Sequence, residues 1–478
     1  MTTRFRRTRI VATLGPASSN PEMISKLVDA GVNVFRLNFS HGKREAHRQN
    51  VEWIRAKAEQ IGRPVGVLQD LQGPKIRVAT FADGKIELAK GQSFALTCDD
   101  DTPGDDSRVG VTYKNLYADV AIDDMLLLDD GRLSLQVTAV RDKTIHTSVV
   151  LGGTLSNNKG INIPGADLSI PGLTDKDVED LEFGAELDVD WVAISFVRSR
   201  DDVVLARHYL SRVGSRAKLM AKIEKPSAVT NFPEILEVVD GIMVARGDLG
   251  VELSAEKVPL VQKRLIREAR KAAKPVITAT QMLESMISSP QPTRAEANDV
   301  ANAICDGTDA VMLSAETAVG SYPVEAVAMM DRIALTMEDD PEQYQSLHDS
   351  IFAQTSTTAD AVALSACRMA EDLGAKVVVS FSQSGATVLR VARNRFATPV
   401  IALTPDPRVC RQLSLCWGTV PMLSEEVVNT DQMVTVANRC IQQSNLVAPG
   451  DRYIVIAGVP FGIRGTTNMI RVERTTRT

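Results

Sequence analysis

The chain has 478 residues, of which 44% are hydrophobic and 24% are charged, and its formal net charge is −6. This is more residues than one hydrophobic core usually accommodates, and it predicts roughly three domains of about 150 residues each. The composition is that of a globular protein, and the negative charge argues against general binding of nucleic acid or of an anionic membrane. Local cations must therefore hold any anionic substrate.

The sequence also argues against a membrane protein and against a disulfide-rich protein. No apolar stretch approaches the roughly 18 residues that a membrane span needs. The basic start of the chain lacks the apolar run of a signal peptide, because Thr13, Gly15 and Pro16 interrupt it. The six cysteines are scattered without a CxxC pair, which favours reduced thiols over disulfides or zinc. We expect a cytoplasmic protein that does not cross a membrane.

Short apolar runs alternate with amphipathic stretches through most of the chain. The runs predict strands at residues 10–14, 32–37, 65–69, 191–196, 218–223, 242–245, 276–279 and 310–313. Helices are predicted at residues 21–30, with Asn20 as N-cap, and at 43–61, 176–186, 201–213, 233–239, 254–273, 294–306 and 323–338. Continuous runs rich in Val and Ile are typical of strands buried on both faces. Eight such units in about 250 residues favour a (β/α)8 TIM barrel, with a doubly wound open sheet as the alternative.

A segment of different character follows the third run. Between residues 73 and 167 we predict strands at 86–88, 94–97, 125–128, 133–137 and 145–150, separated by turn signals such as Asp83-Gly84 and Asp130-Gly131. This pattern indicates an inserted all-β domain, a small β-barrel over residues 71–167. The loop that carries it lies on the active-site face of a TIM barrel, so the insert is placed to act as a lid.

The strand–helix pattern restarts after Asp339-Asp340-Pro341. We predict helices at residues 356–373, 387–394 and 431–443, and strands at 376–380, 399–403 and 453–457. The expected fold is therefore α/β throughout, apart from the insert. Residues 1–70 and 168–340 form the catalytic barrel, and residues 341–478 form a C-terminal α/β domain.

Polar side chains follow six of the eight predicted strands, at the barrel end where TIM-barrel active sites lie. In strand order they are Arg36 to His41, Asp70, Lys222 with Glu224, Arg246 with Asp248, residues 278–281, and Ser314 with Glu316. Such regularity predicts one shared site at this end of the barrel.

Glu224 and Asp248 supply two carboxylates from neighbouring strands, a set that suits Mg²⁺ or Mn²⁺. The alternative is a salt-bridged pair with Lys222 or Arg246. Lys222 lies two residues before Glu224, so both point to one face of their strand. A lysine beside a metal can stabilise the charge of a phosphoryl group in transfer. The sequence therefore predicts a metal-dependent phosphoryl-transfer centre.

Further cations and oxygens surround this centre. The planar guanidinium of Arg36 suits bidentate binding of phosphate. Asn38 and Ser40, with the carboxylate of Asp70, offer oxygens for a monovalent cation, although loop capping explains the first two equally well. Arg77 begins the insert, where it either reaches a nucleotide phosphate or is a plain surface arginine.

Several motifs resemble those of the pyruvate kinase family. They are VFRLNFSHG (34–42), DLQGPKIR (70–77), AKIEKP (221–226), VARGDLG (244–250), ATQMLESM (279–286), PTRAEANDVANAICDG (292–307) and MLSAETAVGSYP (312–323). The resemblance runs from about residue 5 to the C-terminus. It implies the last step of glycolysis, in which a phosphoryl group passes from phosphoenolpyruvate to ADP, giving pyruvate and ATP. It also implies a homotetramer.

The resemblance implies roles for single residues. Glu224 and Asp248 match divalent-metal ligands, Lys222 matches the transition-state lysine, and Arg36 matches the group that binds the substrate phosphate. Thr280, with the backbone near Gly247, would hold the substrate carboxylate and help protonate the enolate through water. The remaining matches are a potassium site of Asn38, Ser40, Asp70 and the Leu71 backbone, and nucleotide-binding positions at Asn38, His41, Arg77 and Lys159.

One departure concerns the potassium site. Many potassium-dependent members of the family have Glu where this chain has Lys75, and Thr where it has Leu71. We hypothesise that the Lys75 ammonium replaces the charge of K⁺. The alternative is that Lys75 points to solvent and K⁺ still binds.

The C-terminal domain resembles the family's effector domain. Ser382, Gln383, Ser384, Gly385 and Thr387 lie between a predicted strand and a predicted helix, where hydroxyls and backbone N–H groups can bind an anion. Simple helix capping by Ser384 or Thr387 is the alternative. Members that bind fructose bisphosphate often have a basic residue where Gln383 stands. We therefore expect activation by a sugar monophosphate or AMP.

Two other functions compete with the kinase. A metal-dependent pyruvate-enolate aldolase shares the barrel, the metal and the enolate, but it needs neither the lid nor an adenine-nucleotide site. A catalytically dead metabolite sensor would be expected to lose some of Lys222, Glu224, Asp248 and Thr280, and all four are present.

Overall fold

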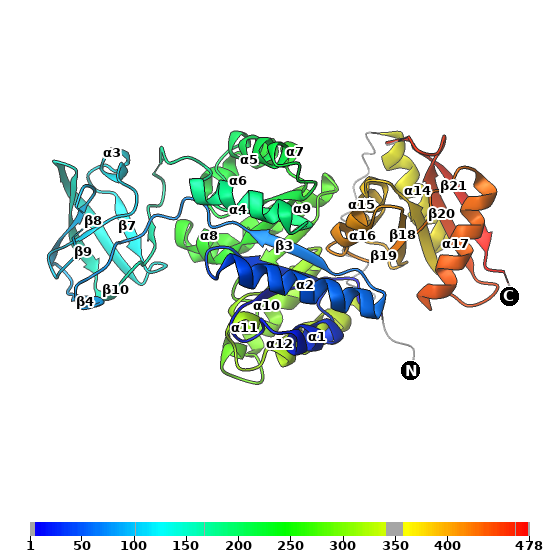
Figure 1. The fold of residues 1–478 in the computed structure, drawn as a ribbon, viewed down its shortest axis with the longest axis horizontal. Coiled ribbons are helices and arrows are strands. Elements are labelled where there is room, and N and C mark those ends of the chain that lie inside the picture. The colour runs from blue at the N-terminus through cyan, green and yellow to red at the C-terminus, as the bar shows by residue number, and fades with distance from the viewer. Residues whose placement is uncertain (1–4, 101, 167, 341–356, 464, 477–478) are drawn as a thin grey trace.

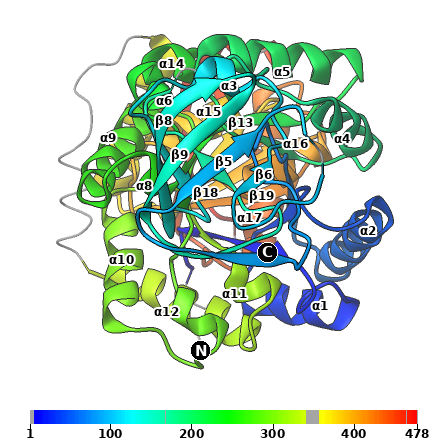
Figure 2. The same ribbon diagram turned by 90° about the vertical axis from the view of Figure 1, so that its left-hand side faces the viewer.

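The computed structural model describes residues 5–100, 102–166, 168–340, 357–463 and 465–476. Figure 1 shows three bodies in a row, with the inserted domain at one end, the barrel in the middle and the C-terminal domain at the other end. Figure 2 looks from the side of the inserted domain, whose strands lie in front of the barrel.

The predicted barrel is confirmed. Eight parallel strands close in the order β1-β16-β15-β14-β13-β12-β3-β2, so the alternative of an open sheet is wrong. The strands are β1 (Arg9–Leu14), β2 (Val34–Asn38), β3 (Gly66–Asp70), β12 (Trp191–Ile194), β13 (Lys218–Ile223), β14 (Gly241–Ala245), β15 (Val276–Ala279) and β16 (Ala310–Leu313). Most of their residues are buried on both faces, which explains why they read as continuous apolar runs.

Helices surround the barrel largely where they were predicted. They are α1 (Pro21–Ala30), α2 (Arg44–Ile61), α4 (Asp175–Glu186), α5 (Arg200–Arg212), α6 (Pro226–Thr230), α7 (Phe232–Val238), α9 (Val258–Lys271), α10 (Arg294–Cys305) and α12 (Pro323–Glu338). Asn20 caps α1 as expected, its side chain accepting the Met23 N–H at 2.8 Å. In the described part of the barrel, four short helical elements were not predicted, namely α6, α8 (Arg246–Glu252), η2 (Glu284–Ile287) and α11 (Ala315–Ala318).

The inserted domain is all-β apart from the short helix α3 (Leu116–Asp119). Its strands are β4 (Lys85–Leu88), β5 (Ser93–Thr97), β6 (Arg108–Gly110), β7 (Met125–Leu128), β8 (Leu133–Arg141), β9 (Thr144–Leu151), β10 (Gly153–Ser156) and β11 (Ile161–Asn162). They pair as a six-stranded sheet and a separate two-stranded sheet, whereas a single small barrel was expected. The strands β6 and β11 were missed because two or three residues cannot display an alternating pattern. The strand β10 was missed because it begins at Gly153, which with Gly152 reads as a turn signal.

The C-terminal domain has a five-stranded sheet in the order β19-β18-β17-β20-β21. Its strands are β17 (Val377–Phe381), β18 (Val400–Thr404), β19 (Thr419–Leu423), β20 (Arg452–Gly458) and β21 (Thr467–Arg474), and its helices are α14 (Thr358–Asp372), α15 (Ala386–Ala392), α16 (Pro407–Leu413) and α17 (Thr430–Ser444). Sequence reasoning missed α16, β19 and β21. The boundary proposed at residue 341 and the helix start at residue 356 lie outside the described residues.

The C-terminal domain docks on the base of the barrel, at the end opposite the predicted site. Arg411 on α16 forms ion pairs with Asp188 at 2.5 Å and with Asp190 at 2.7 Å. The indole Nε1 of Trp191, the first residue of β12, donates to the Gln412 carbonyl at 3.1 Å. Charged and hydrogen-bonded contacts therefore join the two bodies.

Two broader expectations can be compared with the structure. Within the described ranges, no helix combines the length and the hydrophobicity that a bilayer span requires. All six cysteines are free, and five of them are buried, which agrees with the prediction of reduced thiols that pack as small apolar groups.

Candidate active site

Lys222 lies near the carboxyl end of β13 and makes three polar contacts. Its ammonium donates to Ser195 Oγ at 2.8 Å and lies 2.8 Å from Glu224 Oε1 and 3.4 Å from Asp70 Oδ1. Burial favours the neutral amine, but the two carboxylates outweigh it and raise the pKa of Lys222. The side chain is therefore a fixed cation at the mouth of the barrel.

Glu224 is fully buried, and one of its oxygens finds no well-aligned hydrogen bond among the described residues. Oε2 accepts the Phe196 N–H at 2.7 Å, whereas Oε1 faces Lys222 without hydrogen-bond geometry. Burial, together with the neighbouring charge of Asp248, raises the pKa of this carboxyl despite Lys222. Such an oxygen, with Asp248 beside it, fits a divalent cation. Across the described residues, no three His, Cys, Asp or Glu side chains gather as a metal cluster, so other ligands would come from substrate and water.

Asp248 lies in the first turn of α8 and faces Lys75, which lies where the chain passes from the barrel into the inserted domain. Lys75 Nζ is 3.7 Å from Asp248 Oδ1 and 4.0 Å from Asp130 Oδ1 of the inserted domain. The ammonium therefore points into the cleft between the two bodies rather than only to solvent. It approaches a carboxylate of the predicted divalent pair, and in the described part of the chain it forms no ion pair with Asp70.

Arg36 and Asp70 form a rigid pair beside Lys222. Arg36 Nε donates to Asp70 Oδ2 at 2.6 Å, and Nη1 donates to Thr13 Oγ1 at 3.2 Å. Although burial disfavours the charged form of Asp70, the cations of Lys222 and Arg36 lower its pKa below the ordinary value. A guanidinium has five N–H donors, so those not used here can bind an anion.

The predicted potassium ligands lie together at the ends of β2 and β3, where Asn38 pairs with Asp70 in register. Protein donors already engage several of their oxygens. Asn38 Oδ1 accepts the Ser40 N–H at 3.1 Å, which is the capping role left open by the sequence. The Leu71 carbonyl accepts from Ser195 Oγ at 2.7 Å. A monovalent cation would have to share these oxygens.

Thr280 follows β15 with a left-handed backbone, φ 76°, which is strained for a β-branched residue. Two neighbours hold it there. Arg246 Nη2 donates to the Thr280 carbonyl at 2.7 Å. A Cβ placed on Gly247 would lie 2.9 Å from Thr280 Cγ2, so only glycine permits this close approach. The contact brings together the two residues that were predicted to hold a substrate carboxylate.

The predicted nucleotide residues lie on both sides of the cleft. In the inserted domain, Arg77 Nη1 donates to the Asn158 carbonyl at 2.9 Å, and Lys159 pairs with Asp129 at 2.7 Å. On the barrel side, burial lowers the pKa of His41, and the charge of Arg77 lowers it further. These residues give the cleft a positive field in front of Arg36.

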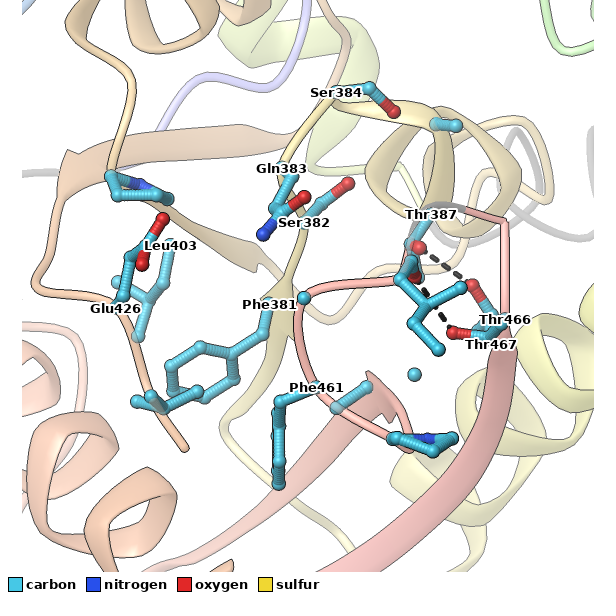
Figure 3. A pocket seen from close by; sticks show the side chains of 18 of the residues that line it. Phe381, Ser382, Gln383, Ser384, Thr387, Leu403, Glu426, Phe461, Thr466 and Thr467 are labelled. Atoms are coloured by element: carbon cyan, nitrogen blue, oxygen red, sulfur yellow. Dashed lines mark hydrogen bonds between the residues drawn. The ribbon is translucent and has the colours of Figure 1, made fainter. Parts of the chain in front are cut away.

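The predicted effector segment borders a cavity of about 330 Å³ in the C-terminal domain, which we call the effector pocket (Figure 3). Its wall includes Ser382, Gln383, Ser384 and Thr387. Thr387 Oγ1 shares a 2.7 Å hydrogen bond with Thr467 Oγ1, and α15 has Gly385 as its N-cap, with no side-chain cap among the described residues. Helix capping by Ser384 or Thr387, the alternative raised from the sequence, is therefore not what these hydroxyls do.

Sequence reasoning missed two residues that position the site, Ser195 at the end of β12 and Thr13 in β1. The rule that polar side chains follow barrel strands would have found Ser195, had the fourth run been ended at Ile194. Glu316, by contrast, was grouped with the site but is structural. It is buried and accepts the Leu283 and Ser314 N–H groups at 3.1 and 2.7 Å.

Comparisons with known proteins point to one family. Residues 5–327 match the family model described as "Pyruvate kinase, barrel domain", and residues 360–473 match "Pyruvate kinase, alpha/beta domain". The chain is 47% identical to a pyruvate kinase of Methylorubrum extorquens over 99% of this chain and 98% of that relative, and 48% identical to one of Agrobacterium vitis over 98% and 96%. A crystal structure of a pyruvate kinase from Cryptosporidium parvum superposes with a TM-score of 0.91 at 36% identity, covering 98% of this chain and 96% of that one.

Proposed function

Since the chain belongs to the pyruvate kinase family, we propose that Lys222, Glu224 and Asp248 form the centre at which it transfers a phosphoryl group from phosphoenolpyruvate to ADP. The chain is a phosphotransferase. The match extends over both the barrel and the C-terminal domain, which favours the kinase over the aldolase alternative.

The observation that carries this assignment is the fixed ammonium of Lys222. Three groups from three strand ends, Ser195, Asp70 and Glu224, hold it in a water-poor site. A charge that is positioned before the reaction stabilises the charge that develops on a phosphoryl group without reorganisation at that moment. Glu224 and Asp248 would hold Mg²⁺ or Mn²⁺, which would supply further neutralisation of phosphoryl oxygens.

The remaining residues would orient the substrates and protonate the enolate. Arg36, locked by Asp70 and Thr13, would hold the phosphate of phosphoenolpyruvate through its other N–H groups. The bond between phosphorus and the enolate oxygen breaks as a bond to a β-phosphate oxygen of ADP forms. Thr280, with the Gly247 backbone, would hold the carboxylate and deliver a proton through water to the enolate carbon, giving pyruvate. His41, Arg77 and Lys159, with Asn38 nearby, would bind the nucleotide.

The test is pyruvate formation from phosphoenolpyruvate and ADP in Lys222→Met. Removal of one preorganised charge should lower kcat by about 10²- to 10³-fold or more, with substrate binding less affected. Lys257→Met, at an exposed lysine, is the control and should keep wild-type turnover. Retention of activity in a folded Lys222→Met enzyme would exclude Lys222 as the transition-state cation.

We also propose that the enzyme works without K⁺, because Lys75 brings a fixed positive charge to the edge of the site. The measurement is turnover with all K⁺ replaced by tetramethylammonium, at constant ionic strength and with Mg²⁺ present. Most activity should remain. Loss of most activity would show that K⁺ is still required.

The effector pocket supports allosteric activation by a sugar monophosphate or AMP. Its hydroxyls at Ser382, Ser384 and Thr387 suit a phosphate, and Gln383 supplies no second cation for a bisphosphate. Thermal-shift titrations with sugar monophosphates and AMP test this, with Ser382→Asp as the variant that should lose the response. The absence of a shift with every compound would refute an effector role.

The family resemblance also carries the proposals of a homotetramer and of a cytoplasmic location for this glycolytic step. Sedimentation equilibrium of the full chain measures the first. A mass of four chains is expected, and a monomer at micromolar concentration would contradict it.

A further inference from the structure

A buried carboxylate joins the barrel to the inserted domain at the place where the two bodies meet. Glu252 is the last residue of α8, and its side chain is only 1% exposed. Its Oε1 accepts from Lys225 Nζ at 2.5 Å and from Asn162 Nδ2 at 2.8 Å. Lys225 follows β13 of the barrel, whereas Asn162 lies in β11 of the inserted domain. We call these three side chains the Glu252 clasp.

The inserted domain is connected to the barrel by two segments of chain that pair with each other. One segment enters the domain at residues 71–77, and the other leaves it after β11. The Ile161 N–H donates to the Ile76 carbonyl at 2.9 Å, and Arg77 forms an antiparallel bridge with Gly160. Because the two segments are linked, the orientation of the inserted domain depends on what this pair of segments contacts on the barrel.

Backbone groups make two of these contacts. The Gly73 N–H donates to Asp177 Oδ1 at 3.0 Å, and the Leu168 carbonyl accepts from Arg198 Nη1 at 2.5 Å. Asn162 differs from Gly73 and Leu168, because it contributes a side chain to the barrel. A single substitution in the inserted domain can therefore remove the Glu252 clasp and leave the other two contacts in place.

The surroundings of the Glu252 clasp increase the effect of its hydrogen bonds. Asn162 is 4% exposed, and beside it Ile161, Leu168 and Phe196 give apolar walls to a cavity of about 30 Å³. A buried carboxylate that loses a partner in such a place still bears the cost of its desolvation. Rotation of the inserted domain away from the barrel would withdraw Asn162 from Glu252. The clasp therefore favours the orientation that the structure shows.

The Glu252 clasp is built on the same two elements that carry the predicted divalent-metal ligands. Lys225 directly follows Glu224, and Glu252 lies four residues after Asp248, on the same face of α8. Lys225 Nζ also lies 5.9 Å from the centroid of the Phe196 ring, and the N–H of Phe196 donates to Glu224 Oε2 at 2.7 Å. The orientation of the inserted domain is therefore linked to the positions of Glu224 and Asp248.

We propose that Glu252, Lys225 and Asn162 are positioning residues that hold the inserted domain over the active-site end of the barrel. This inference rests on the proposed function, because the clasp would bring Arg77 and Lys159 within reach of the nucleotide. Loss of the clasp lowers the fraction of molecules in which the cleft is closed. The apparent affinity for a ligand that needs both bodies falls in proportion to that fraction.

The kinetic test compares the two substrates. ADP is expected to contact both bodies, whereas phosphoenolpyruvate is expected to contact the barrel alone. Asn162→Ala should therefore raise KM for ADP about tenfold, the usual range for a lost hydrogen bond to a charged group, and keep KM for phosphoenolpyruvate within about twofold. Thr138→Ala, at an exposed residue of β8 in the same domain, is the matched control and should change neither constant.

A rescue experiment separates positioning from general damage to the fold. Lys225→Met leaves the Glu252 carboxylate buried without its cation, so it should raise KM for ADP about tenfold or more. Adding Glu252→Gln removes that charge and keeps an oxygen that accepts from Asn162, so the double variant should recover most of the loss. Lys257→Met, at an exposed lysine beyond the end of α8, should behave like wild type.

Double electron–electron resonance measures the orientation of the inserted domain without turnover. Spin labels are attached to the full-length protein at Arg141→Cys in the inserted domain and at Gln60→Cys on α2, both exposed positions. The background carries Cys305→Ala, because Cys305 is the native thiol that is not buried. Asn162→Ala and Lys225→Met should broaden the distribution of distances between the labels, and Thr138→Ala should leave it unchanged.

The inference requires both readouts to change together. An unchanged distance distribution in Asn162→Ala and Lys225→Met would show that the clasp does not hold the inserted domain. A broadened distribution with an unchanged KM for ADP would make the clasp a structural contact without a role in nucleotide binding. A protein that forms no pyruvate would contradict the proposed function instead. The distances would still test the clasp in that case, with the Kd for ADP from calorimetry in place of KM.

Discussion

Ser195 Oγ accepts a hydrogen bond from the Lys222 ammonium at 2.8 Å and donates one to the Leu71 carbonyl at 2.7 Å. The hydroxyl thereby connects the ends of three neighbouring barrel strands, β3, β12 and β13. It fixes the direction of Lys222 between Asp70 and Glu224 without adding charge. The position of the cation depends on this neutral group as well as on its two carboxylates.

Replacement of Ser195 by alanine should therefore lower kcat and leave the fold intact. A hydrogen bond to a charged group contributes about 1.5–3 kcal/mol, so we expect kcat to fall by about tenfold to a hundredfold, while KM for ADP stays near its wild-type value. Steady-state kinetics measure this, and Ser195→Thr, which keeps the hydroxyl, should recover part of the loss. A wild-type kcat in Ser195→Ala would mean that the carboxylates alone position Lys222.

Two glycines of α8 give a matched pair for the contact with Thr280. In Gly247→Ala the new methyl would lie 2.9 Å from Thr280 Cγ2, whereas in Gly250→Ala its nearest neighbour would be Val258 Cγ2 at 3.8 Å. Neither position has a positive φ, so helix propensity favours alanine at both by roughly 0.5–1 kcal/mol. We expect Gly247→Ala to raise KM for phosphoenolpyruvate at least tenfold, and Gly250→Ala to keep it. Equal kinetics in the two variants would contradict a role for this contact.

The sequence predicted the barrel, and it grouped most of the polar side chains that the structure brings together at one end of it, because both signals lie in short local stretches of sequence. Continuous apolar runs marked every barrel strand, and the spacing of Lys222 and Glu224 placed both on one face of β13. Ser195 was missed for the same reason, since the run of residues 191–196 absorbed it into the strand. The helix α8 was hidden because Gly247 and Gly250 weaken helix propensity, so that residues 246–248 read as a loop.

Long-range relationships were not predictable in this way. The approach of Lys75 to Asp248 depends on how the inserted domain sits over the barrel, which no local pattern encodes. The same is true of the cavity between the barrel and the C-terminal domain, whose lysines and arginines come from β13, α9, the loop before β15, and α15 with its C-cap. Candidate roles could be proposed residue by residue from the sequence, but the pairing of charges across domain boundaries required the fold.

Asp240 should make the stability of the protein depend on pH. Burial disfavours its charged form, but Lys218 and Arg207 outweigh this and lower its pKa. A carboxyl whose pKa is lower in the folded state adds stability above its unfolded pKa of about 3.9, and loses it as the pH falls through the folded value. Asp240→Asn should therefore lower the apparent Tm by about 2–6 °C at pH 7, with a smaller difference at pH 3.5.

The exposed carboxylate of Asp201 on α5 provides the comparison for Asp240. Asp201→Asn should leave the apparent Tm within about 1 °C of wild type at both pH values, since surface charges contribute little. Differential scanning calorimetry of the three proteins at pH 7 and pH 3.5 makes the measurement. A Tm difference for Asp240→Asn that grows as the pH falls would reverse the sign and contradict the argument.

Lys75 gives the last prediction, since its ammonium 3.7 Å from Asp248 is a charge that can be reversed. Lys75→Glu removes this cation and places a further carboxylate beside Asp248. Turnover of this variant should fall at least tenfold in tetramethylammonium and recover when K⁺ is added, because a mobile cation then supplies the missing charge. Lys85→Glu, at an exposed lysine of β4, should respond like wild type. A Lys75→Glu enzyme whose turnover is indifferent to K⁺ would show that the ammonium does not stand in for a monovalent cation, and that its role is confined to Asp248 and the inserted domain.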